Sequence, residues 1–303
     1  MGSSALHPNS LDERYRPVFW DTWDASMAEL PLITQQRNTT KQVERGSEII
    51  AGVATVPVVA EGGEITRFTP QQGNEYSFTQ RTYKLGFSIT EEFREDDLWN
   101  QVSDYFRIQA AIMANTVKST LYNHYNRAFD SAYPMSYNST EMCSTAQPLA
   151  GGGTTSNHIA TNADMTETSV EALVQLLVDS TNADGVYVAQ TPSKLLHASA
   201  NWGQGRRLTQ STTTTLQGTG ASGNAINALG AYNIVPHFSP YLSDANAFFV
   251  MADEAPVVLY WRIPLTKYEP TVDPDTRAWN YDVRARWISG PLTWRTIAGS
   301  PGA

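Results

Sequence analysis

Three pairs of neighbouring carboxylates are the residues of this sequence best suited to chemistry. The pairs are Asp96-Asp97, Asp253-Glu254 and Asp273-Pro274-Asp275. A glycosidase needs two carboxyl groups about 5 to 10 Å apart, one of them as a general acid. The first pair is better explained by the start of a helix, whose dipole favours negative charge, and the other two by turns. Carbohydrate hydrolysis by these pairs stays as the enzymatic alternative.

The residue types that bind metals are too few or wrongly spaced for a metal site. The five histidines lack H-x-x-x-H or similar spacing, and Cys143 is the only cysteine. The turn at 273–275 supplies two carboxylates, whereas calcium takes about six to eight oxygen ligands. Cys143 has no informatively spaced histidine and is interpreted as an inert thiol. We therefore predict no metal, no cofactor and no catalytic residue.

Two glycine-rich stretches match nucleotide-binding motifs only in part. Residues 218–223 fit G-x-G-x-x-G, but a threonine run precedes them where the dinucleotide fingerprint requires a hydrophobic strand. The run at 151–153 lacks the Lys-Ser or Lys-Thr of a P-loop. Residues 209–223 are instead interpreted as a mobile surface loop.

The composition predicts a folded protein that binds neither nucleic acid nor membranes. With 41% hydrophobic and 11% aromatic residues, the chain can bury a substantial core. Its formal net charge of −9 argues against a surface that holds nucleic-acid phosphates. No apolar run approaches the roughly 18 residues of a membrane span, and no signal segment is recognised. Together with the single cysteine, this predicts a reducing cytoplasm as the place of synthesis.

The first fifty residues are predicted to form an arm. They combine three prolines with many aromatic and polar residues, and only 21–30 suggest a short helix. Trp20 and Trp23 would be costly to expose on such an arm. These two residues are therefore expected to pack on the body of this chain or on a neighbouring chain.

Residues 51–90 are predicted to form a long β-hairpin. Turn residues at 61–64 separate two β-like runs, and the aromatic residues of the second run alternate with polar ones. The alternation changes phase between Phe78 and Tyr83, which predicts a bulge or kink there. A lone hairpin is marginally stable in water, so this one needs a surface to lie on.

Residues 91–130 contain neither proline nor glycine and predict one long helix. Thr90 is the candidate N-cap, and acidic residues fill the first turns. One continuous helix would be about 60 Å long at 1.5 Å per residue, longer than a compact globule of this chain length. Two helices with a break near Ala114-Asn115 are the alternative. The apolar stripe consists of Trp99, Val102, Phe106, Ala110, Met113, Val117 and Leu121.

The rest of the chain predicts an α/β domain followed by a returning strand. A capping-box pattern at 168–171 precedes a helix over 172–178. Residues 186–189 are typical of a buried strand, and Thr191-Pro192 of the start of another helix. Further strands are predicted near 233–235, 247–251, 257–262 and 279–287.

The order of these parts resembles the major capsid proteins of tailed bacteriophages, the Hong Kong 97-type fold, and in particular the Mu-like branch. Gln147 stands where histidine is commoner in that branch. The segments that carry the resemblance include GFSITEEFREDDLW (86–99), CSTAQPLAGGGTTSN (143–157), TPSKLL (191–196), SPYLSDANAFFVMAD (239–253) and WRTIAGSPGA (294–303).

The resemblance implies an α+β fold with five segments. These are an N-terminal arm (1–50), an extension-loop β-hairpin (51–90), a peripheral domain with a spine helix and β-sheet (91–160), an α/β axial domain (161–270) and a C-terminal strand that returns to the peripheral domain (271–303). It also implies a structural subunit, not an enzyme, that forms hexamers and pentamers in an icosahedral shell. That shell would enclose the double-stranded DNA of a tailed phage without sequence-specific binding.

The resemblance further implies partners, a location and contacts. Scaffolding, portal and decoration proteins are the implied partners besides the chain itself, and the virion capsid is the implied location after assembly in the host bacterial cytoplasm. An encapsulin-like nanocompartment shell, which would hold enzyme cargo instead of a genome, is the alternative within the same fold. The predicted inter-subunit contacts are Trp20, Trp23, Phe68, Tyr76, Phe78, Tyr83 and Phe87.

Overall fold

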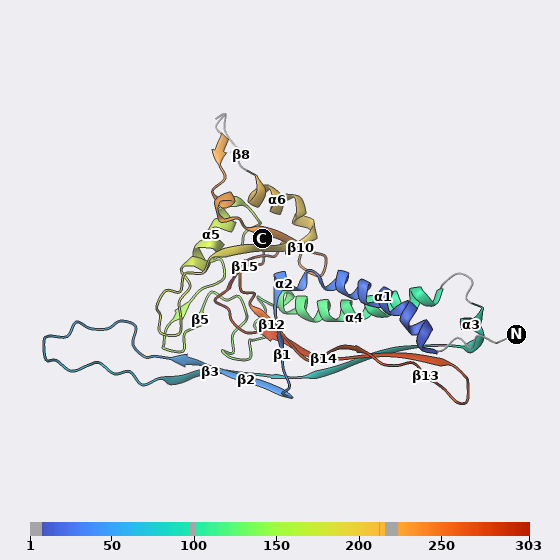
Figure 1. Cartoon of the computed structure of the whole chain (residues 1–303). Coiled ribbons are helices and arrows are strands. Elements are labelled where there is room, and N and C mark those ends of the chain that lie inside the picture. The colour runs from blue at the N-terminus through green and yellow to red at the C-terminus, as the bar shows by residue number, and fades with distance from the viewer. Residues whose placement is uncertain (1–7, 97–100, 212, 216–223) are drawn as a thin grey trace.

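The molecule consists of an elongated base and a smaller unit that rises from it (Figure 1). The computed structural model describes residues 8–96, 101–211, 213–215 and 224–303. Within these ranges the fold is a mixture of helices and two main sheets. The G-x-G-x-x-G stretch at 218–223, Asp97 and Trp99 lie outside the described residues.

A five-stranded sheet forms the base. β12 (Val257–Lys267) pairs with one side of the central strand β14 (Trp279–Pro291), and β4 (Arg81–Ile89) pairs with the other. β1 (Thr34–Asn38) runs parallel to β12, and the short β13 (Thr271–Val272) pairs with β14. Alternate residues of β14 are buried, which confirms the alternation predicted for this strand. The sheet therefore has one face toward the core and an outer face.

The spine helix packs against the core face of the large sheet, but it is shorter than predicted. α3 (Glu91–Glu95) ends before Asp96, which is its C-cap and is not helical, and α4 runs from Gln101 to Asn126. The 26 residues of α4 make a rod of about 39 Å. The alternative break near Ala114-Asn115 is absent, because α4 is helical without interruption through these residues.

The N-terminal arm is helical, so the prediction of a mostly irregular arm is wrong. α1 (Pro8–Met27) and the short α2 (Leu30–Ile33) precede β1. Tyr15, Phe19 and Trp23 recur every fourth residue and are buried, and the Tyr15 ring stacks on Phe106 of α4 at 5.4 Å. This packing outweighs the interruption that Pro17 causes inside α1.

The hairpin begins within the predicted arm. β2 (Val43–Ile50) and β3 (Gln71–Thr79) pair as antiparallel strands, and residues 51–70 between them contain no strand. β4 does not continue this hairpin but pairs with β14. The predicted change of phase between Phe78 and Tyr83 is confirmed, because the chain passes there from one sheet to the other.

The smaller unit contains a four-stranded sheet in the order β10 (Val235–Ser239), β7 (Pro192–Ala198), β11 (Phe248–Ala252) and β15 (Ile297–Ser300). α5 (Glu167–Val178) and α6 (Trp202–Gln210) pack on it. The capping box of α5 uses Thr166 with Ser169, two residues before the predicted cap. The helix predicted from Thr191-Pro192 is wrong. Pro192 starts a central strand, a position at which proline is tolerated.

Other strands also depart from the predicted segments. Residues 186–189 are not a buried strand, and Tyr187 is 73% exposed. β12 falls within the predicted axial segment but lies in the large sheet, and β15 follows β14 but joins the smaller sheet. The remaining short elements are β5 (Gln147–Pro148), β6 (Thr154–Thr155), β8 (Thr213–Thr215), β9 (Asn224–Ile226), η1 (Ser199–Asn201) and η2 (Ala228–Tyr232).

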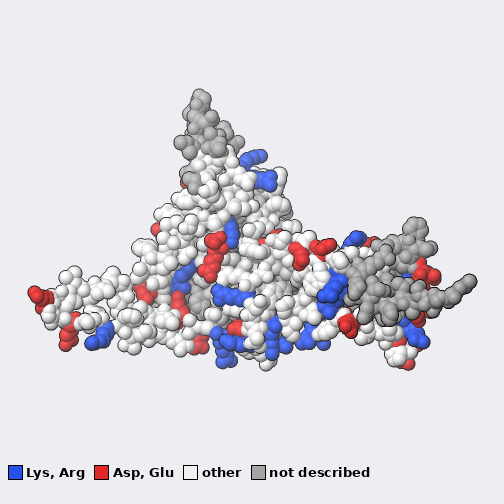
Figure 2. Space-filling model, viewed as in Figure 1, with Lys and Arg blue, Asp and Glu red and all other residues white. Residues whose placement is uncertain are grey.

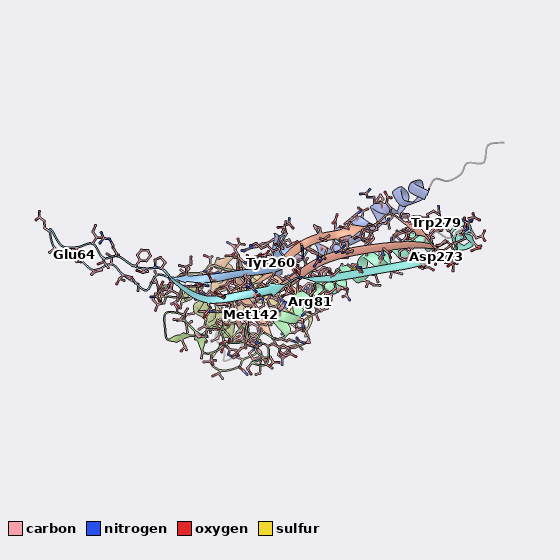
Figure 3. The ribbon with its side chains drawn as sticks, turned by 90° about the horizontal axis from the view of Figure 1, so that it is seen from below. Glu64, Arg81, Met142, Tyr260, Asp273 and Trp279 are labelled. Carbon is pink, nitrogen blue, oxygen red and sulfur yellow. The ribbon has the colours of Figure 1, made fainter. Side chains whose placement is uncertain are left out.

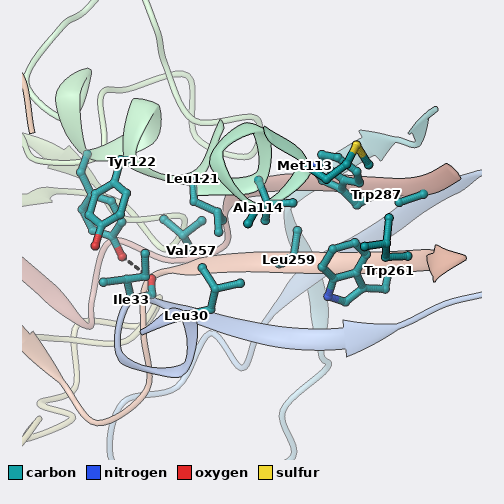
Figure 4. Packing of buried hydrophobic residues seen from close by; sticks show 14 of the residues in the cluster. Leu30, Ile33, Met113, Ala114, Leu121, Tyr122, Val257, Leu259, Trp261 and Trp287 are labelled. Carbon is teal, nitrogen blue, oxygen red and sulfur yellow. Dashed lines mark hydrogen bonds between the residues drawn. The ribbon is translucent and has the colours of Figure 1, made fainter. Parts of the chain in front are cut away.

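One hydrophobic core joins α1, α2, α4 and the large sheet (Figure 4). Leu121 and Ala114 of α4 lie against Val257 and Leu259 of β12, and the Tyr125 hydroxyl donates a hydrogen bond to the Ile33 carbonyl. Burial of each large apolar side chain contributes about 1.5–3 kcal/mol. In the described part of the chain, none of the helices has the length and apolar character needed to cross a membrane.

Candidate assembly surfaces

A loop formed by residues 51–70 extends beyond the base (Figure 1). Seen from below, Glu64 lies near its tip, at the opposite end of the molecule from Asp273 and Trp279 (Figure 3). Residues 52–70 are exposed, and they include many apolar side chains. Such clustered exposed apolar groups indicate an interaction surface. The apolar residues are Val53, Val56, Val58, Val59, Ile65 and Phe68.

Polar contacts fix the root of this loop to the smaller unit. The Asp184 carboxylate accepts hydrogen bonds from the backbone N–H groups of Ala51 (3.1 Å) and Gly52 (2.7 Å). In β2, two residues before its end at Ile50, Glu48 Oε1 lies 2.8 Å from Arg295 Nη1 in a mostly buried ion pair. Arg295 Nε also donates to the Thr181 carbonyl at 2.7 Å. These contacts hold the β2 end of the loop against the smaller unit. We call Glu48, Asp184 and Arg295 the root latch.

The predicted contact residues of β3 and β4 are largely covered by this chain. Phe78 is 8% exposed and packs with Val258 and Tyr260 on the outer face of the large sheet. Tyr76 is partly buried and lies 5.4 Å from Phe78 between ring centroids. The reason is that β3 folds back onto the sheet, which gives the hairpin root a surface within its own chain.

The contact residues of β4 face the core because this strand pairs with β14. The Tyr83 ring stacks on Trp287 at 3.7 Å, and the Phe87 ring stacks on Tyr281 at 5.2 Å. Phe68 is different, since it lies on the projecting loop and is 58% exposed. The inter-subunit role of all these residues stays a prediction, and Phe68 offers the most surface for it.

The two tryptophans of the arm pack on the body of this chain. Trp23 is 8% exposed and meets Trp261 edge to face at 6.5 Å. Trp20 is partly buried beside Phe19, at 5.2 Å. Because α1 covers α4, these rings are satisfied without a second subunit. Their contact with a neighbouring subunit also stays a prediction, and Trp20 retains the larger accessible surface.

Sequence reasoning missed several residues that shape these surfaces. Val56 and Val58 belong to the apolar run before the turn at 61–64, which was interpreted as a strand. The apolar character of this run was the signal that could have identified an exposed contact surface. Asp184 and Arg295 give no local signal, because each contacts a residue more than 100 positions away. An apolar groove beside β4 was also missed. It is lined by Leu85, Phe87, Tyr105, Ile108 and Ile112 together with Gly86 and Gln109.

The carboxylate pairs are placed by turns and caps. Asp273 accepts the backbone N–H of Asp275 at 2.9 Å, and these turn hydrogen bonds lower the pKa of the Asp273 carboxyl. Glu254 lies 3.9 Å from Arg37 in an exposed ion pair, and Asp96 is the C-cap of α3, so the prediction that it lies at the start of a helix is wrong. Among the residues that the structure describes, no three His, Cys, Asp or Glu side chains are grouped to hold a metal ion.

Burial shifts the pKa of two further titratable side chains, Cys143 and His124. Cys143 is buried, and burial raises the pKa of its thiol far above the range of a reactive thiolate. Burial lowers the pKa of His124 to about 4, although a hydrogen bond with Ser289 acts in the opposite direction. These side chains fill the core.

An elongated base with a spine helix, a projecting hairpin loop and a second α/β unit define a Hong Kong 97-type capsid subunit. The chain belongs to the phage capsid protein family, whose model matches residues 74–299. A search of the curated proteins found no match. Family membership makes this a structural protein of the virion capsid, and capsid subunits associate with copies of themselves into a multi-subunit shell.

Solved structures share the fold at low sequence identity. The capsid of cyanophage P-SCSP1u is similar with a TM-score of 0.59 and 10% identity, over 89% of this chain and 86% of that chain. A chain of Mycobacterium phage Patience is similar with a TM-score of 0.56 and 15% identity, over 99% and 89%. A virus-like particle from Pyrococcus furiosus is similar with a TM-score of 0.54 and 9% identity, over 95% and 98%. None of these likenesses favours an encapsulin-like shell over a phage capsid.

Proposed function

We propose that copies of this chain assemble as hexamers and pentamers into an icosahedral shell that encloses the double-stranded DNA of a tailed phage. Assembly takes place in the cytoplasm of the host bacterium. The observation that carries the proposal is the loop at 51–70, whose apolar side chains are uncovered by their own chain. In a closed shell every copy covers the loop of another, so contacts that are individually modest become strong in sum.

The charge of the chain supports a container for DNA. The formal net charge of −9 disfavours tight binding of phosphates, which would hinder the loading and release of a genome. The DNA is thus enclosed without sequence-specific contacts. The role is structural, and it uses no cofactor, metal or catalytic residue.

The proposal extends to contacts and partners. Phe68 and the exposed part of Trp20 would bury most of the area between subunits, together with the accessible parts of Trp23, Tyr76, Phe78, Tyr83 and Phe87. Scaffolding, portal and decoration proteins are the proposed partners that start, orient and reinforce the shell. Membranes have no part in this function.

The test is expression of the full chain followed by size-exclusion chromatography and electron microscopy. Closed particles or capsomers are the expected result. A folded chain that stays monomeric over a wide range of protein and salt concentration contradicts the proposal. Double-stranded DNA inside native particles distinguishes a genome shell from a nanocompartment, which would instead contain an enzyme.

A further inference from the structure

Four cations gather on and beside the outer face of the large sheet. Lys84 of β4 lies directly opposite Arg284 of β14 in the strand register, and Arg286 follows two residues along on the same face. Desolvation and the neighbouring charges of Arg262 and Arg284 lower the pKa of Arg286. Figure 2 shows Lys and Arg side chains along the lower edge of the body, beneath this sheet. We call Lys84, Arg262, Arg284 and Arg286 the basic strip.

The basic strip has no acidic partner in the part of the chain that the structure describes. No ion pair there involves any of its four cations. The Nε atoms of Arg284 and Arg286 are buried without a hydrogen-bond acceptor, although Arg284 Nη1 donates to the Tyr268 hydroxyl at 3.4 Å. Like charges directly opposite each other destabilise a sheet. A chain of net charge −9 thus concentrates cations where they repel one another, and carboxylates from a partner would relieve this repulsion.

β4 is an edge strand of the large sheet. Among the described strands it pairs with β14 alone, and none of the residues from Arg81 to Ser88 is buried. α4 holds the strand in place, because Gln109 Nε2 donates hydrogen bonds to the carbonyls of Leu85 (3.2 Å) and Tyr281 (2.9 Å). The uncovered edge of a strand presents N–H and C=O groups with which a further strand can pair.

An apolar groove lies between this strand and α4. Tyr105, Ile108 and Ile112 of α4 line the groove with exposed fractions of 37%, 54% and 46%, and β4 contributes Leu85 and Phe87. The groove has a volume of about 120 Å³, close to the roughly 150 Å³ of a cavity that binds benzene, so it can hold one large apolar side chain. Side chains alternate between the two faces of a strand. A strand added beside β4 would therefore place alternate residues in the groove and the others beside the basic strip.

The outward-facing residues of β4 fix which charge each residue of an added strand meets. Lys84 would lie opposite one outward residue, and Thr82, which is small and pairs with Arg286, would lie opposite the next. Acidic side chains are favoured at both positions, because neighbouring strands lie about 4.8 Å apart and the long Arg286 side chain can reach across Thr82. Gly86 is different, since the Asp282 carboxylate lies over it and would repel a third acidic side chain. The surface thus selects two acidic residues and then a neutral or basic one, with apolar residues between them.

This pattern identifies the partner as a different protein. Acidic residues at alternate positions of this chain occur only at 95 and 97 and at 273 and 275, and the residues between them are Asp96 and Pro274 instead of aliphatic or aromatic ones. A second copy therefore does not supply the alternating segment. A nucleic acid also fits less well, because its phosphates would meet the Asp282 carboxylate and would leave the apolar groove uncovered.

We propose that β4 accepts an extended segment of a different protein as an added strand, with acidic side chains opposite Thr82 and Lys84 and apolar side chains in the groove. Main-chain hydrogen bonds to the edge would supply affinity, and the alternating side chains would supply specificity. This inference goes beyond the shell proposed above, and its first test uses the unassembled subunit.

The test is the binding of a fluorescein-labelled synthetic peptide to the unassembled full chain, measured by fluorescence anisotropy. In this peptide four leucines alternate with two glutamates and one lysine, in the orders Glu-Glu-Lys and Lys-Glu-Glu for the two directions in which a strand can add. One order should bind, and the same residues in a scrambled order should bind about tenfold or more weakly. Methylation of alternate backbone nitrogens should abolish binding for the set that faces β4 and preserve it for the other set, because only the first set donates to the edge.

Charge reversal in the chain tests the basic strip. Lys84→Glu with Arg284→Glu should weaken peptide binding by about tenfold or more, because the acidic peptide then meets like charges. A peptide with lysines in place of the glutamates should recover binding to this variant, since the pair is rebuilt with opposite sign. Arg45→Glu with Arg67→Glu reverses two exposed cations of the projecting hairpin and is the matched control, which should leave peptide binding unchanged. Circular dichroism shows whether each variant is folded, and Lys84→Gln with Arg284→Gln is the milder variant if charge reversal prevents folding.

Several outcomes would overturn the proposal. An alternating peptide that binds no better than the scrambled one, or that tolerates methylation of either set, excludes strand addition. If no peptide binds and the folded Lys84→Gln, Arg284→Gln variant aggregates, the strip serves to protect the edge from pairing. A peptide that binds the subunit but not wild-type particles shows that a second copy covers the edge, and tighter binding of a single-stranded oligonucleotide makes nucleic acid the partner. A wild-type chain that forms no particles contradicts the proposed function but leaves the peptide test on the subunit intact.

Discussion

The spine helix buries its apolar side chains within the chain, whereas the projecting loop exposes them to solvent. α4 buries its stripe against α1 and the large sheet, and Phe106, Val117 and Leu121 have no exposed surface. The loop at 51–70 is also rich in apolar residues, but these are exposed to solvent. The difference divides the molecule into a part whose burial is complete in one chain and a part whose burial, on the proposed function, is provided by another copy. Stability of the subunit and assembly of the shell are therefore expected to depend on different residues.

The largest loss of stability in the isolated subunit should come from a substitution in the buried core around α4. Phe106→Ala removes a ring that packs with Tyr15, Phe87 and Tyr281, and it should lower the free energy of unfolding by about 3–5 kcal/mol. Urea unfolding of unassembled subunits measures this loss. Ile108→Ala, on the exposed face of the same helix, is the control and should change stability by less than about 1 kcal/mol. Equal losses at the two positions would show that α4 does not have one buried face.

Acid should weaken the same core through His124. Its pKa falls from the ordinary 6.5 to about 4 in the folded chain, so the unfolded chain takes up the proton first as the pH falls. The stabilisation is thus fully present above about pH 6.5 and is lost as the pH falls to about 4, by about 3 kcal/mol.

His124→Gln removes this titration and should flatten that part of the pH dependence. Urea unfolding of unassembled subunits at several pH values between 4 and 7 measures the slope. Ser289→Ala provides a comparison, because it removes the hydrogen-bond partner of His124 but leaves the buried imidazole. A slope that is unchanged by His124→Gln would assign the acid sensitivity to other groups.

The root latch lies between the two regions and should have an intermediate effect. Arg295→Met leaves Glu48 mostly buried without its partner, which should cost about 2 kcal/mol. Hydrogen exchange at Ala51 and Gly52 should also increase, because the turn that presents Asp184 loses the Arg295 contact to Thr181. The double variant with Glu48→Gln should cost less than the sum of the single changes, since it leaves no unpaired charge. Strictly additive losses would show that the pair is not coupled.

The sequence could predict the parts of the fold that depend on local chemistry. The apolar stripe of α4, the alternation of β14 and the change of phase before Tyr83 each follow from the periodicity of a single element. The helix of the arm was missed because its stability comes from packing on α4, which outweighs Pro17. β7 was taken for a helix because a short buried run after a proline is consistent with either structure.

The assembly surface was predictable only in outline. Exposed apolar residues on a hairpin indicate a contact surface, and the family resemblance indicates that the partner is another copy of the chain. The sequence does not show which aromatic residues the chain covers itself, because that depends on β4 pairing with a strand almost 200 residues later. For the same reason Asp184, Arg295 and the opposition of Lys84 to Arg284 could not be found from local patterns.

Substitutions in the projecting loop should have the smallest effect on the stability of the subunit, although they should abolish assembly. Val58→Asp with Phe68→Asp places charges on a loop that makes no contact with its own core, so the free energy of unfolding should change by less than about 0.5 kcal/mol. Particle formation should be abolished, because the carboxylates would be buried without partners between subunits. Val178→Asp, at an exposed apolar residue ending α5, is the matched control and should leave assembly intact. Normal particles from the loop variant would mean that its apolar residues are not covered by another copy, and the division between a complete core and an incomplete loop would then fail.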